Sequence, residues 1–447
     1  MNHKILFISL GCDKNLVDSE MMLGLLAQRG YEFTDDETQA DIAVVNTCCF
    51  INDAKQESID MILDMAELRK NGAISALFVT GCLAQRYQEE IQKEIPEVDV
   101  IIGVTAIDEI VDALDAFFAG RKENHYKSLL EKPLTDVKRI VTTGGHYAYL
   151  KIAEGCDKHC TYCIIPKVRG SYRSVPMESL LKEAEALAFD GVKELIIVAQ
   201  DTTVYGVDLY GRKMLPDLLK ELCKIENIRW IRILYCYPEE IDDKLIRVIK
   251  EEPKICHYLD LPIQHGCDTI LKRMGRRTNR NELTEIIGKL RKEIPDICIR
   301  TTLITGFPGE TDEEHETLLE FVDQMEFDRL GVFTYSQEED TPAALMPGQI
   351  PEEVKEERFA QLMELQQEIA FEAASSMEGR SVEAMIEGKI ADEEAYVART
   401  YKDAPGVDGF LFVNTKRELM SGDLIRCRIT GSHEYDLIGE LEDEFTE

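Results

Sequence analysis

The segment EGCDKHCTYC (residues 154–163) places three cysteines, Cys156, Cys160 and Cys163, within ten residues. Most protein-bound cubane clusters of iron and sulfur are held by four thiolates, one on each iron. A closed structural zinc site also takes four ligands, usually as two pairs, and a single nucleophile needs only one thiol. The spacing C-x3-C-x2-C therefore predicts a four-iron cluster with one iron left open to a small molecule.

The strand that leads into these cysteines opens a repeating pattern of apolar runs and amphipathic helices. Six runs predict strands: YAYLKIAE, KELIIVAQ, IRWIRILY, CHYLDLPI, CIRTTLIT and RLGVFTYS. Strands that alternate with helices form parallel sheets with covered faces. Six such units are too few for a closed eight-stranded barrel, so we predict a central partial (β/α)6 barrel over residues 142–376. Functional residues in such folds lie at the carboxyl ends of the strands.

The same alternation fills residues 1–120, where four runs predict the strands of an open parallel α/β sheet: KILFISL, DIAVVN, ALFVT and VDVII. Residues 121–141 are polar and read as a linker. From residue 377 to 447, five short β-like runs separated by turns predict a small antiparallel β-barrel.

Three cysteines of the first domain, Cys12, Cys48 and Cys82, each end one of its predicted strands. The carboxyl ends of parallel strands share one edge of a sheet, so we expect these thiols to converge into a second three-thiol site. Separate buried roles for each cysteine are the alternative. Side chains alternate along an extended segment, so the adjacent Cys48 and Cys49 should point apart, and we assign Cys48 as the ligand.

Composition restricts the partners. The chain has 85 acidic and 51 basic residues, a net charge of −34, whereas nucleic-acid binders present a basic footprint. The start, MNHKILFISLGCDKN, lacks the apolar stretch of a signal peptide or a membrane span. We therefore expect a cytoplasmic protein without membrane attachment, whose thirteen cysteines are metal ligands, reactive thiols or buried side chains rather than disulfides.

The run from Cys156 to Cys163 closely resembles the signature of the radical S-adenosylmethionine superfamily. The resemblance implies that the open iron binds the amino and carboxylate groups of S-adenosylmethionine, which electron transfer cleaves to a 5′-deoxyadenosyl radical. It also implies a place near the adenine for Tyr162, for which core packing is the alternative.

Further residues at the ends of the central strands are candidate cofactor contacts: Gln200, Gln264, His265, Gly306 and Gly309. The polar side chains are candidates for ribose, methionine or substrate, and the glycines would let backbone approach the cofactor closely. An ordinary loop histidine and a simple strand-to-helix turn are the alternatives. In the basic run KVRGSYRS, Lys167, Arg169 or Arg173 could hold a carboxylate, and a solvated loop is the alternative.

Nearly the whole chain resembles the methylthiotransferase family of radical S-adenosylmethionine enzymes. The motifs that carry the resemblance are SLGCDKNLVDSE, VNTCCFINDAKQESI, VTGCLAQR, EGCDKHCTYCIIPKVRG and LPIQHG, and the terminal module resembles a TRAM domain. SLGCDKN together with LYCYP (234–238) resembles the ribosomal-protein (RimO-type) branch.

The resemblance implies two [4Fe-4S] clusters, one on Cys156, Cys160 and Cys163 and an auxiliary one whose open iron carries the sulfur to be inserted. It implies an external electron donor and transfer of a methylthio group to the β-carbon of an aspartate in small-subunit ribosomal protein twelve. Modification of a tRNA adenosine is the main alternative, and a two-cluster electron-transfer protein is a weaker one.

The terminal module bears on the choice of partner. Residues 377–447 contain 17 acidic and 8 basic residues, and the run ELEDEFTE (440–447) has no basic residue. We expect this acidic surface to steer a basic ribosomal protein in and to repel RNA.

Overall fold

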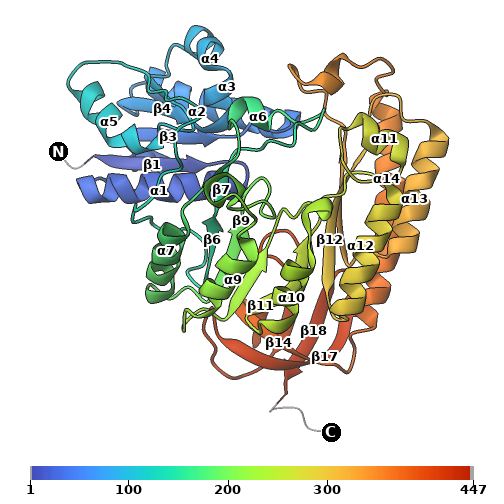
Figure 1. Cartoon of the computed structure of the whole chain (residues 1–447). Helices are drawn as coiled ribbons and strands as arrows, with labels where there is room; N and C mark the ends of the chain where they lie inside the picture. The colour runs from blue at the N-terminus through green and yellow to red at the C-terminus, as the bar shows by residue number, and fades with distance from the viewer. Residues whose placement is uncertain (1–2, 443–447) are drawn as a thin grey trace.

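Two parallel α/β units and a closed β-barrel make up the chain in the computed structural model, which describes residues 3–442 (Figure 1). The first unit is a five-stranded parallel sheet with the order β2-β1-β3-β4-β5. Its strands are β1 (Lys4–Ser9), β2 (Glu32–Phe33), β3 (Ile42–Thr47), β4 (Ala76–Thr80) and β5 (Val100–Ile102). The exposed two-residue strand β2 was not predicted, because so short a polar pair leaves no periodic signal.

Helices cover both faces of this sheet. They are α1 (Asp13–Arg29), α2 (Asn52–Lys70), α3 (Gly81–Arg86), α4 (Gln88–Glu94) and α5 (Ile110–Phe118), with short 3-10 turns at Glu37–Gln39 and Ile107–Glu109. Strand β3 is buried along its whole length, as expected for a strand with a helix layer on each side. One apolar cluster joins the sheet to α1 and α5, and another joins it to α2, α3 and α4.

The central unit is an open six-stranded parallel sheet whose order, β6-β9-β10-β11-β12-β13, follows the chain. The strands are β6 (Tyr147–Lys151), β9 (Glu194–Val198), β10 (Trp230–Ile233), β11 (Ile255–Asp260), β12 (Cys298–Thr305) and β13 (Arg329–Thr334). This arrangement confirms the predicted partial barrel. A small antiparallel pair, β7 (Ala153–Glu154) with β8 (Arg173–Ser174), was not predicted and flanks the cysteine segment.

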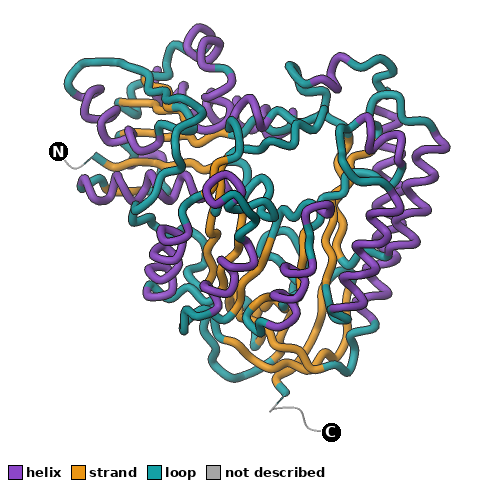
Figure 2. The backbone as a smooth tube through the Cα atoms, in the orientation of Figure 1, coloured by secondary structure: helices purple, strands orange, loops and turns teal. Residues whose placement is uncertain are grey.

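Helices lie on the outer side of the central sheet (Figure 2). The longer ones are α7 (Met177–Phe189), α9 (Leu215–Cys223), α10 (Asp243–Glu251), α12 (Arg280–Glu293), α13 (Asp312–Met325) and α14 (Glu352–Ser375). The short ones are α6 (Ile165–Val168), α8 (Val207–Tyr210), α11 (Asp268–Arg273) and two 3-10 turns, η3 (Pro238–Glu240) and η4 (Pro342–Leu345). Among the described residues, none of the helices has the length and apolar composition of a membrane-spanning segment.

The segment between the two units, residues 121–146, has no helix or regular strand but packs closely against α1. The backbone amide of Thr142 donates to Glu20 Oε1 at 2.7 Å, and that of Ile140 donates to the Glu20 carbonyl at 3.1 Å. The predicted linker is therefore a strap held against the first unit.

The last five strands close into a barrel in the order β14-β15-β16-β18-β17. They are β14 (Ser381–Lys389), β15 (Ala395–Thr400), β16 (Leu411–Asn414), β17 (Leu424–His433) and β18 (Asp436–Leu441). The expected antiparallel pairing holds for four of the five neighbouring pairs, but β16 and β18 are parallel. Strand β16 ends the series β14-β15-β16, and β18 ends the hairpin β17-β18. These two strands pair when the barrel closes, and in a closed ring of five strands the directions cannot alternate at every neighbour, so one pair is parallel.

Buried ion pairs join the barrel to the amino ends of the central strands. Glu194, the first residue of β9, accepts hydrogen bonds at 2.7 Å from both Arg399 of β15 and Arg232 of β10. All three side chains are fully buried. Burial alone would raise the pKa of Glu194, but the two guanidinium groups hold it below its usual value.

The barrel therefore lies below the central sheet, away from the first unit (Figure 1). It sits at the opposite ends of the strands from the cysteine segment, so any steering of a basic partner by its acidic surface acts at a distance from the thiols. The acidic run ELEDEFTE lies mostly outside the described residues, which end at Glu442.

Replacing Glu194 tests this joint. In Glu194→Gln, two buried guanidinium groups lose their shared carboxylate, and we expect the free energy of unfolding in urea to fall by about 3–5 kcal/mol. Glu221→Gln, which breaks an exposed pair between Glu221 of α9 and Lys224 just after that helix, should change it by no more than about 1 kcal/mol. Equal effects in the two variants would contradict the joint.

Candidate functional site

The three N-terminal cysteines lie at the carboxyl ends of three neighbouring strands. Cys12 precedes α1 just after β1, Cys48 follows β3 directly, and Cys82 lies in the first turn of α3 after β4. Because β1, β3 and β4 are adjacent in the sheet, the three residues share one edge, as predicted. Cys48 and Cys82 are buried, whereas Cys12 is exposed.

Two glycines at this edge have no room for a side chain. Gly11 has a φ of 88°, and a Cβ on it would lie 2.9 Å from Cys48 Sγ. Gly81 has a φ of 92°, and its Cβ would lie 2.4 Å from the Thr47 carbonyl oxygen. Glycine is the residue that adopts this backbone without strain. The sequences SLGC and VTGC thus bring the backbone of one cysteine segment against the next.

Asn15 ties the same edge together. Its Nδ2 donates to the carbonyls of Leu10, at 3.1 Å, and Thr47, at 2.8 Å, and its Oδ1 lies 3.7 Å from Cys82 Sγ. The side chain is fully buried. Asn15 lies three residues after Cys12 in SLGCDKN, but its residue type and position gave no sign of this role in the sequence.

Cys49 differs from Cys48 in its surroundings. Cys48 lies against Gly11, and its backbone amide donates to Ser58 Oγ at 2.9 Å. Cys49 packs into the apolar cluster beneath α2 and α3. This difference agrees with the alternation argument, and the assignment of Cys48 as the ligand stays a prediction.

The central cysteines occupy a loop between β7 and α6. Cys156 and Cys160 are buried and Cys163 is partly buried. Gly155, with a φ of 74°, precedes the loop, and a Cβ on it would lie 2.1 Å from the Ser171 carbonyl oxygen. The Thr161 backbone donates to the Met274 carbonyl at 2.9 Å, so the middle of the loop is anchored to the end of α11.

Two side chains that the sequence analysis missed contact Cys160. Tyr237 Oη lies 4.0 Å from Cys160 Sγ, and Arg276 Nη1 donates to the same sulfur at 3.9 Å. The Arg276 guanidinium also stacks over the Tyr237 ring at 4.4 Å. Tyr237 lies in LYCYP, which served only to distinguish branches of the family, and Arg276 lies outside every quoted motif.

Both sets of thiols have the chemistry that an iron–sulfur cluster needs. Burial raises the pKa of Cys156 to about 11 and that of Cys48 to about 12. Thiols bind iron as thiolates, so assembly of a cluster on either set releases their protons. Within residues 3–442, no three Cys, His, Asp or Glu side chains converge at single-ion spacing. A cubane differs from a single ion because each thiolate binds a different iron, so its ligands need not converge on one point.

Polar atoms without hydrogen-bond partners among the described residues gather near the carboxyl ends of the central strands. They include Gln200 Oε1, Glu239 Oε2, His265 Nε2, Arg276 Nε and Thr305 Oγ1. Buried polar groups are nearly always hydrogen-bonded, so this cluster of unsatisfied atoms fits a site that takes a polar ligand. Gln200 remains a predicted cofactor contact on this ground.

Gln264 and His265 are held differently from each other. Gln264 is nearly buried with a left-handed φ of 75°, fixed because its amide donates to the Thr302 carbonyl and its carbonyl accepts from Ile304. Such strain costs about 1–3 kcal/mol and concentrates at functional sites. His265 is fully buried. Its Nδ1 accepts from the Cys267 amide at 3.0 Å and its Nε2 has no hydrogen-bond partner among the described residues, so its role as a contact stays a prediction.

The two glycines after β12 face protein side chains. A Cβ on Gly306 would lie 2.4 Å from Lys355 Cγ, and one on Gly309 would lie 2.3 Å from Arg273 Nη1. Both have positive φ. Close packing and backbone conformation thus suffice to require glycine, and cofactor approach at these positions stays a prediction. Tyr162 packs against an apolar cluster that contains Phe307 and Tyr335, and its place near an adenine also stays a prediction.

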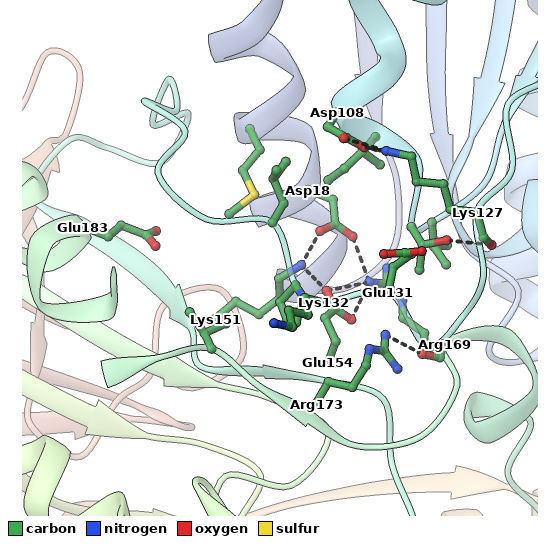
Figure 3. Close-up of a pocket in the computed structure, with 17 residues that line it drawn as sticks. Asp18, Asp108, Lys127, Glu131, Lys132, Lys151, Glu154, Arg169, Arg173 and Glu183 are labelled. Carbon is green, nitrogen blue, oxygen red and sulfur yellow. Dashed lines mark hydrogen bonds and ion pairs between the residues drawn. The ribbon is translucent and has the colours of Figure 1, made fainter. Parts of the chain in front are cut away.

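A buried ion-pair network links the two α/β units (Figure 3). Arg169, just after α6, donates to Asp18 of α1 at 2.8 Å and to Glu154 of β7 at 3.2 Å. Lys151, at the end of β6, pairs with the same two carboxylates. The network borders a cavity of about 130 Å³ that is open to solvent.

Arg169 also reaches the N-terminal cysteines. Its Nε donates to Cys82 Sγ at 3.4 Å, and another nitrogen contacts Asn15 Oδ1. Burial alone would lower the pKa of Arg169, but the Cys82 sulfur and the carboxylates of Asp18 and Glu154 raise it. The basic run KVRGSYRS thus does hold carboxylates, but they belong to the chain itself.

A second clamp closes the opposite side of the interface. Arg86 of α3 and Lys55 of α2 both pair with Glu338 at 3.1 Å, in the loop after β13. The Asn52 amide donates to Ser336 Oγ in the same loop at 3.2 Å. The strand ends that carry the two sets of cysteines are therefore fixed relative to each other on both sides.

Comparisons with known proteins divide the chain in the same way. Residues 4–103 match "Uncharacterized protein family UPF0004", residues 150–322 the "Radical SAM superfamily" and residues 379–441 the "TRAM domain". A ribosomal protein uS12 methylthiotransferase RimO from Lachnoclostridium phytofermentans is 63% identical over 98% of this chain and 100% of its own. One of the same name from Desulfitobacterium hafniense is 48% identical over 99% of each chain.

Among solved structures, the radical S-adenosylmethionine methyltransferase TsrM from Kitasatospora setae, with cobalamin and a [4Fe-4S] cluster bound, is similar in fold. It aligns over 77% of each chain with a TM-score of 0.56 and 12% sequence identity. At that identity the similarity concerns the fold alone.

Arg169→Met tests the interface network. It would leave Asp18 and Glu154 buried with Lys151 as their sole remaining cation, and we expect the free energy of unfolding of the cluster-free protein in urea to fall by about 3–5 kcal/mol. Arg169→Lys should recover only part of this loss, because an ammonium cannot reproduce the planar fork of donors.

Lys167→Met is the matched control, because Lys167 lies two residues earlier and is exposed. It should stay within about 0.5 kcal/mol of the unmodified chain. An Arg169→Met variant as stable as Lys167→Met would show that the network does not hold the two units together.

Proposed function

The chain belongs to the ribosomal protein uS12 methylthiotransferase (RimO) family of radical S-adenosylmethionine enzymes, and we propose that it transfers a methylthio group to the β-carbon of an aspartate in uS12, small-subunit ribosomal protein twelve. Similarity over essentially the full length of both relatives supports the substrate.

Membership of the radical S-adenosylmethionine superfamily implies S-adenosylmethionine and an iron–sulfur cluster. We propose that the cofactors are two [4Fe-4S] clusters, one on Cys156, Cys160 and Cys163 and one on Cys12, Cys48 and Cys82. The cluster on Cys156, Cys160 and Cys163, together with S-adenosylmethionine, would supply the radical that removes a hydrogen atom from the substrate. The cluster on Cys12, Cys48 and Cys82 would supply the sulfur. An external donor would supply the electrons, in the cytoplasm where ribosomes are found.

In this scheme, residues of the chain position the cysteines and compensate the charge of the clusters. Gly11 and Gly81 bring the N-terminal cysteine segments together, and Asn15 fixes them. The Arg169 guanidinium donates to Cys82 Sγ, and the Arg276 guanidinium donates to Cys160 Sγ, so a positive charge lies beside each sulfur. A thiolate-bound cluster carries negative charge, so a buried guanidinium beside each one compensates part of it. No carboxylate needs to act as a base, because the hydrogen leaves as an atom.

The main support for the proposal is a short series of contacts that connects the two sets of cysteines across the interface between the two α/β units. Asp13, next to Cys12, accepts a hydrogen bond from Tyr235 Oη at 3.2 Å. Tyr237, two residues further on, approaches Cys160 Sγ at 4.0 Å. A reaction that joins a substrate radical to a sulfur needs both groups at one cavity, held in register.

A tRNA substrate is less well supported. The net charge of the chain is −34, and phosphate-binding surfaces need lysine and arginine to release counterions. The electron-transfer alternative would leave the unsatisfied polar atoms at the strand ends without a purpose.

The assignment of two clusters predicts how iron divides among variants. After anaerobic reconstitution, Cys160→Ala and Cys48→Ala should each keep about half of the iron, because each removes one of two clusters. Cys160→Ala should lose S-adenosylmethionine cleavage, whereas Cys48→Ala should keep cleavage and lose sulfur insertion. Iron per chain and 5′-deoxyadenosine formation are the measurements.

Cys49→Ser is the matched control, since Cys49 is adjacent to Cys48 but packs into the core. It should retain iron and turnover with a modest loss of stability. Full iron in Cys48→Ser together with iron loss in Cys49→Ser would reverse the choice of ligand.

The substrate assignment predicts a simple selectivity. With S-adenosylmethionine and reductant, the reconstituted enzyme should add the methylthio mass to uS12 and leave total tRNA unmodified, as measured by mass spectrometry of both. Modification of tRNA with none on uS12 would refute the proposed function.

A further inference from the structure

Asp13, Lys14 and Tyr235 form a buried group between the two sets of cysteines. Asp13 and Lys14 begin α1 directly after Cys12, and Tyr235 follows β10 of the central sheet. Lys14 Nζ lies 2.9 Å from Asp13 Oδ1 and 3.3 Å from the centre of the Tyr235 ring. The group therefore joins the segment SLGCDKN to the segment LYCYP across the domain interface.

The backbone at Tyr235 is held in an unusual state. Its φ is 57°, a left-handed conformation that is strained for a bulky aromatic residue. Its amide donates to Asp260 Oδ2 at 3.0 Å and its carbonyl accepts from the Thr202 amide at 3.0 Å. These bonds aim the ring at Lys14, and strain of this kind, fixed by its surroundings, is typical of ligand-binding positions.

The charges in the group are incompletely satisfied. The Asp13 and Lys14 side chains are each 8% exposed. Asp13 Oδ1 accepts from Lys14 and from Tyr235, whereas Asp13 Oδ2 has no hydrogen-bond partner among the described residues. An ammonium has three N–H donors. The partners of Lys14 within residues 3–442 are one carboxylate oxygen of Asp13 and the side chain of Tyr235, and Cys12 lies close enough to interact with its charge.

Other cations near the two sets of thiols are more fully engaged. Lys158 pairs with three carboxylates, Arg169 bridges Asp18 and Glu154, and Arg276 donates to the Pro262 carbonyl and to Cys160. Lys14 has a single acidic partner, which is its neighbour in sequence. Lys14 can therefore accept a second carboxylate without breaking an ion pair between elements, which Lys158 and Arg169 cannot. Arg276 is instead held beside Cys160 and the Tyr237 ring.

We propose that Lys14, with Tyr235 as its aromatic wall, is the subsite that binds the carboxylate of the target aspartate, an inference that rests on the proposed function. The carboxylate of an aspartate is attached to the β-carbon that reacts, so a cation that fixes it also fixes the reacting carbon between the two sites. Asp13 holds the ammonium in place while no substrate is bound. Because a buried charge binds an anion far better than a neutral isostere, the subsite selects aspartate over asparagine.

Binding without turnover tests the subsite. The target aspartate is first located by mass spectrometry of uS12 that the enzyme without substitutions has modified. A uS12 variant with asparagine at that position is then prepared. Both proteins, fluorescently labelled, are titrated with reconstituted enzyme without reductant, and anisotropy gives each Kd. We expect the unmodified enzyme to prefer the aspartate form by about 30-fold or more.

In Lys14→Met this preference should fall to about threefold or less, while iron per chain stays at the unmodified value. Lys14→Arg should keep most of the preference, because it keeps the charge. Lys70→Met, which removes an exposed lysine at the far end of α2, should keep all of it. If Lys14→Met loses iron or unfolds, Tyr235→Leu removes the aromatic wall and should lower the preference at least fivefold.

A Lys14→Met enzyme, or in its place a Tyr235→Leu enzyme, that retains the unmodified preference would overturn the subsite. So would an unmodified enzyme that modifies uS12 yet binds the two forms equally. Failure of the unmodified enzyme to modify uS12 at all would instead refute the proposed function, so the two failures are distinguishable.

Discussion

The fold depends on burying the Arg169 guanidinium across the boundary between two parallel sheets. The carboxyl ends of parallel strands bring functional side chains to one edge of a sheet. Two sheets without contacts between them would leave the relative positions of their two edges undefined. Arg169 bridges Asp18 of one unit and Glu154 of the other while donating to Cys82. A buried charge is tolerated only when it is paired in good geometry, so this arrangement holds a single relative orientation, and the Glu338 clamp secures the other side.

The same electrostatic device recurs at the opposite ends of the central strands, where Glu194 binds Arg232 and Arg399. Buried ion pairs thus join the central sheet to the N-terminal α/β unit at one end of its strands and to the barrel at the other end. The barrel is consequently part of the scaffold of the catalytic unit rather than a detachable module. Its excess of acidic residues lies far from the thiols, which suits long-range attraction of a basic protein better than direct contact with the reacting residue.

Periodicity and spacing predicted both parallel sheets, because a strand buried on two faces leaves a continuous apolar run. The shared sheet edge of Cys12, Cys48 and Cys82 followed from their positions at the ends of successive parallel strands. What the sequence could not supply were contacts between segments far apart in the chain: Arg276 on Cys160, Asn15 on Cys82 and Tyr235 on Lys14. Periodicity also gave no sign of β2 or of the β7–β8 pair, and the parallel pairing of β16 with β18 arises from barrel closure. Gly306 and Gly309 were expected to face a ligand, whereas packing against Lys355 and Arg273 is reason enough for them.

We propose that two clusters lie at one cavity in a fixed arrangement, and the magnetic interaction between them can be measured. Electron paramagnetic resonance spectra of the fully loaded, reduced enzyme should be compared with those of variants that carry one cluster each. The two reduced clusters should broaden or split each other's signals, so that the spectrum differs from the sum of the single-cluster spectra. A spectrum equal to that sum would contradict a shared cavity.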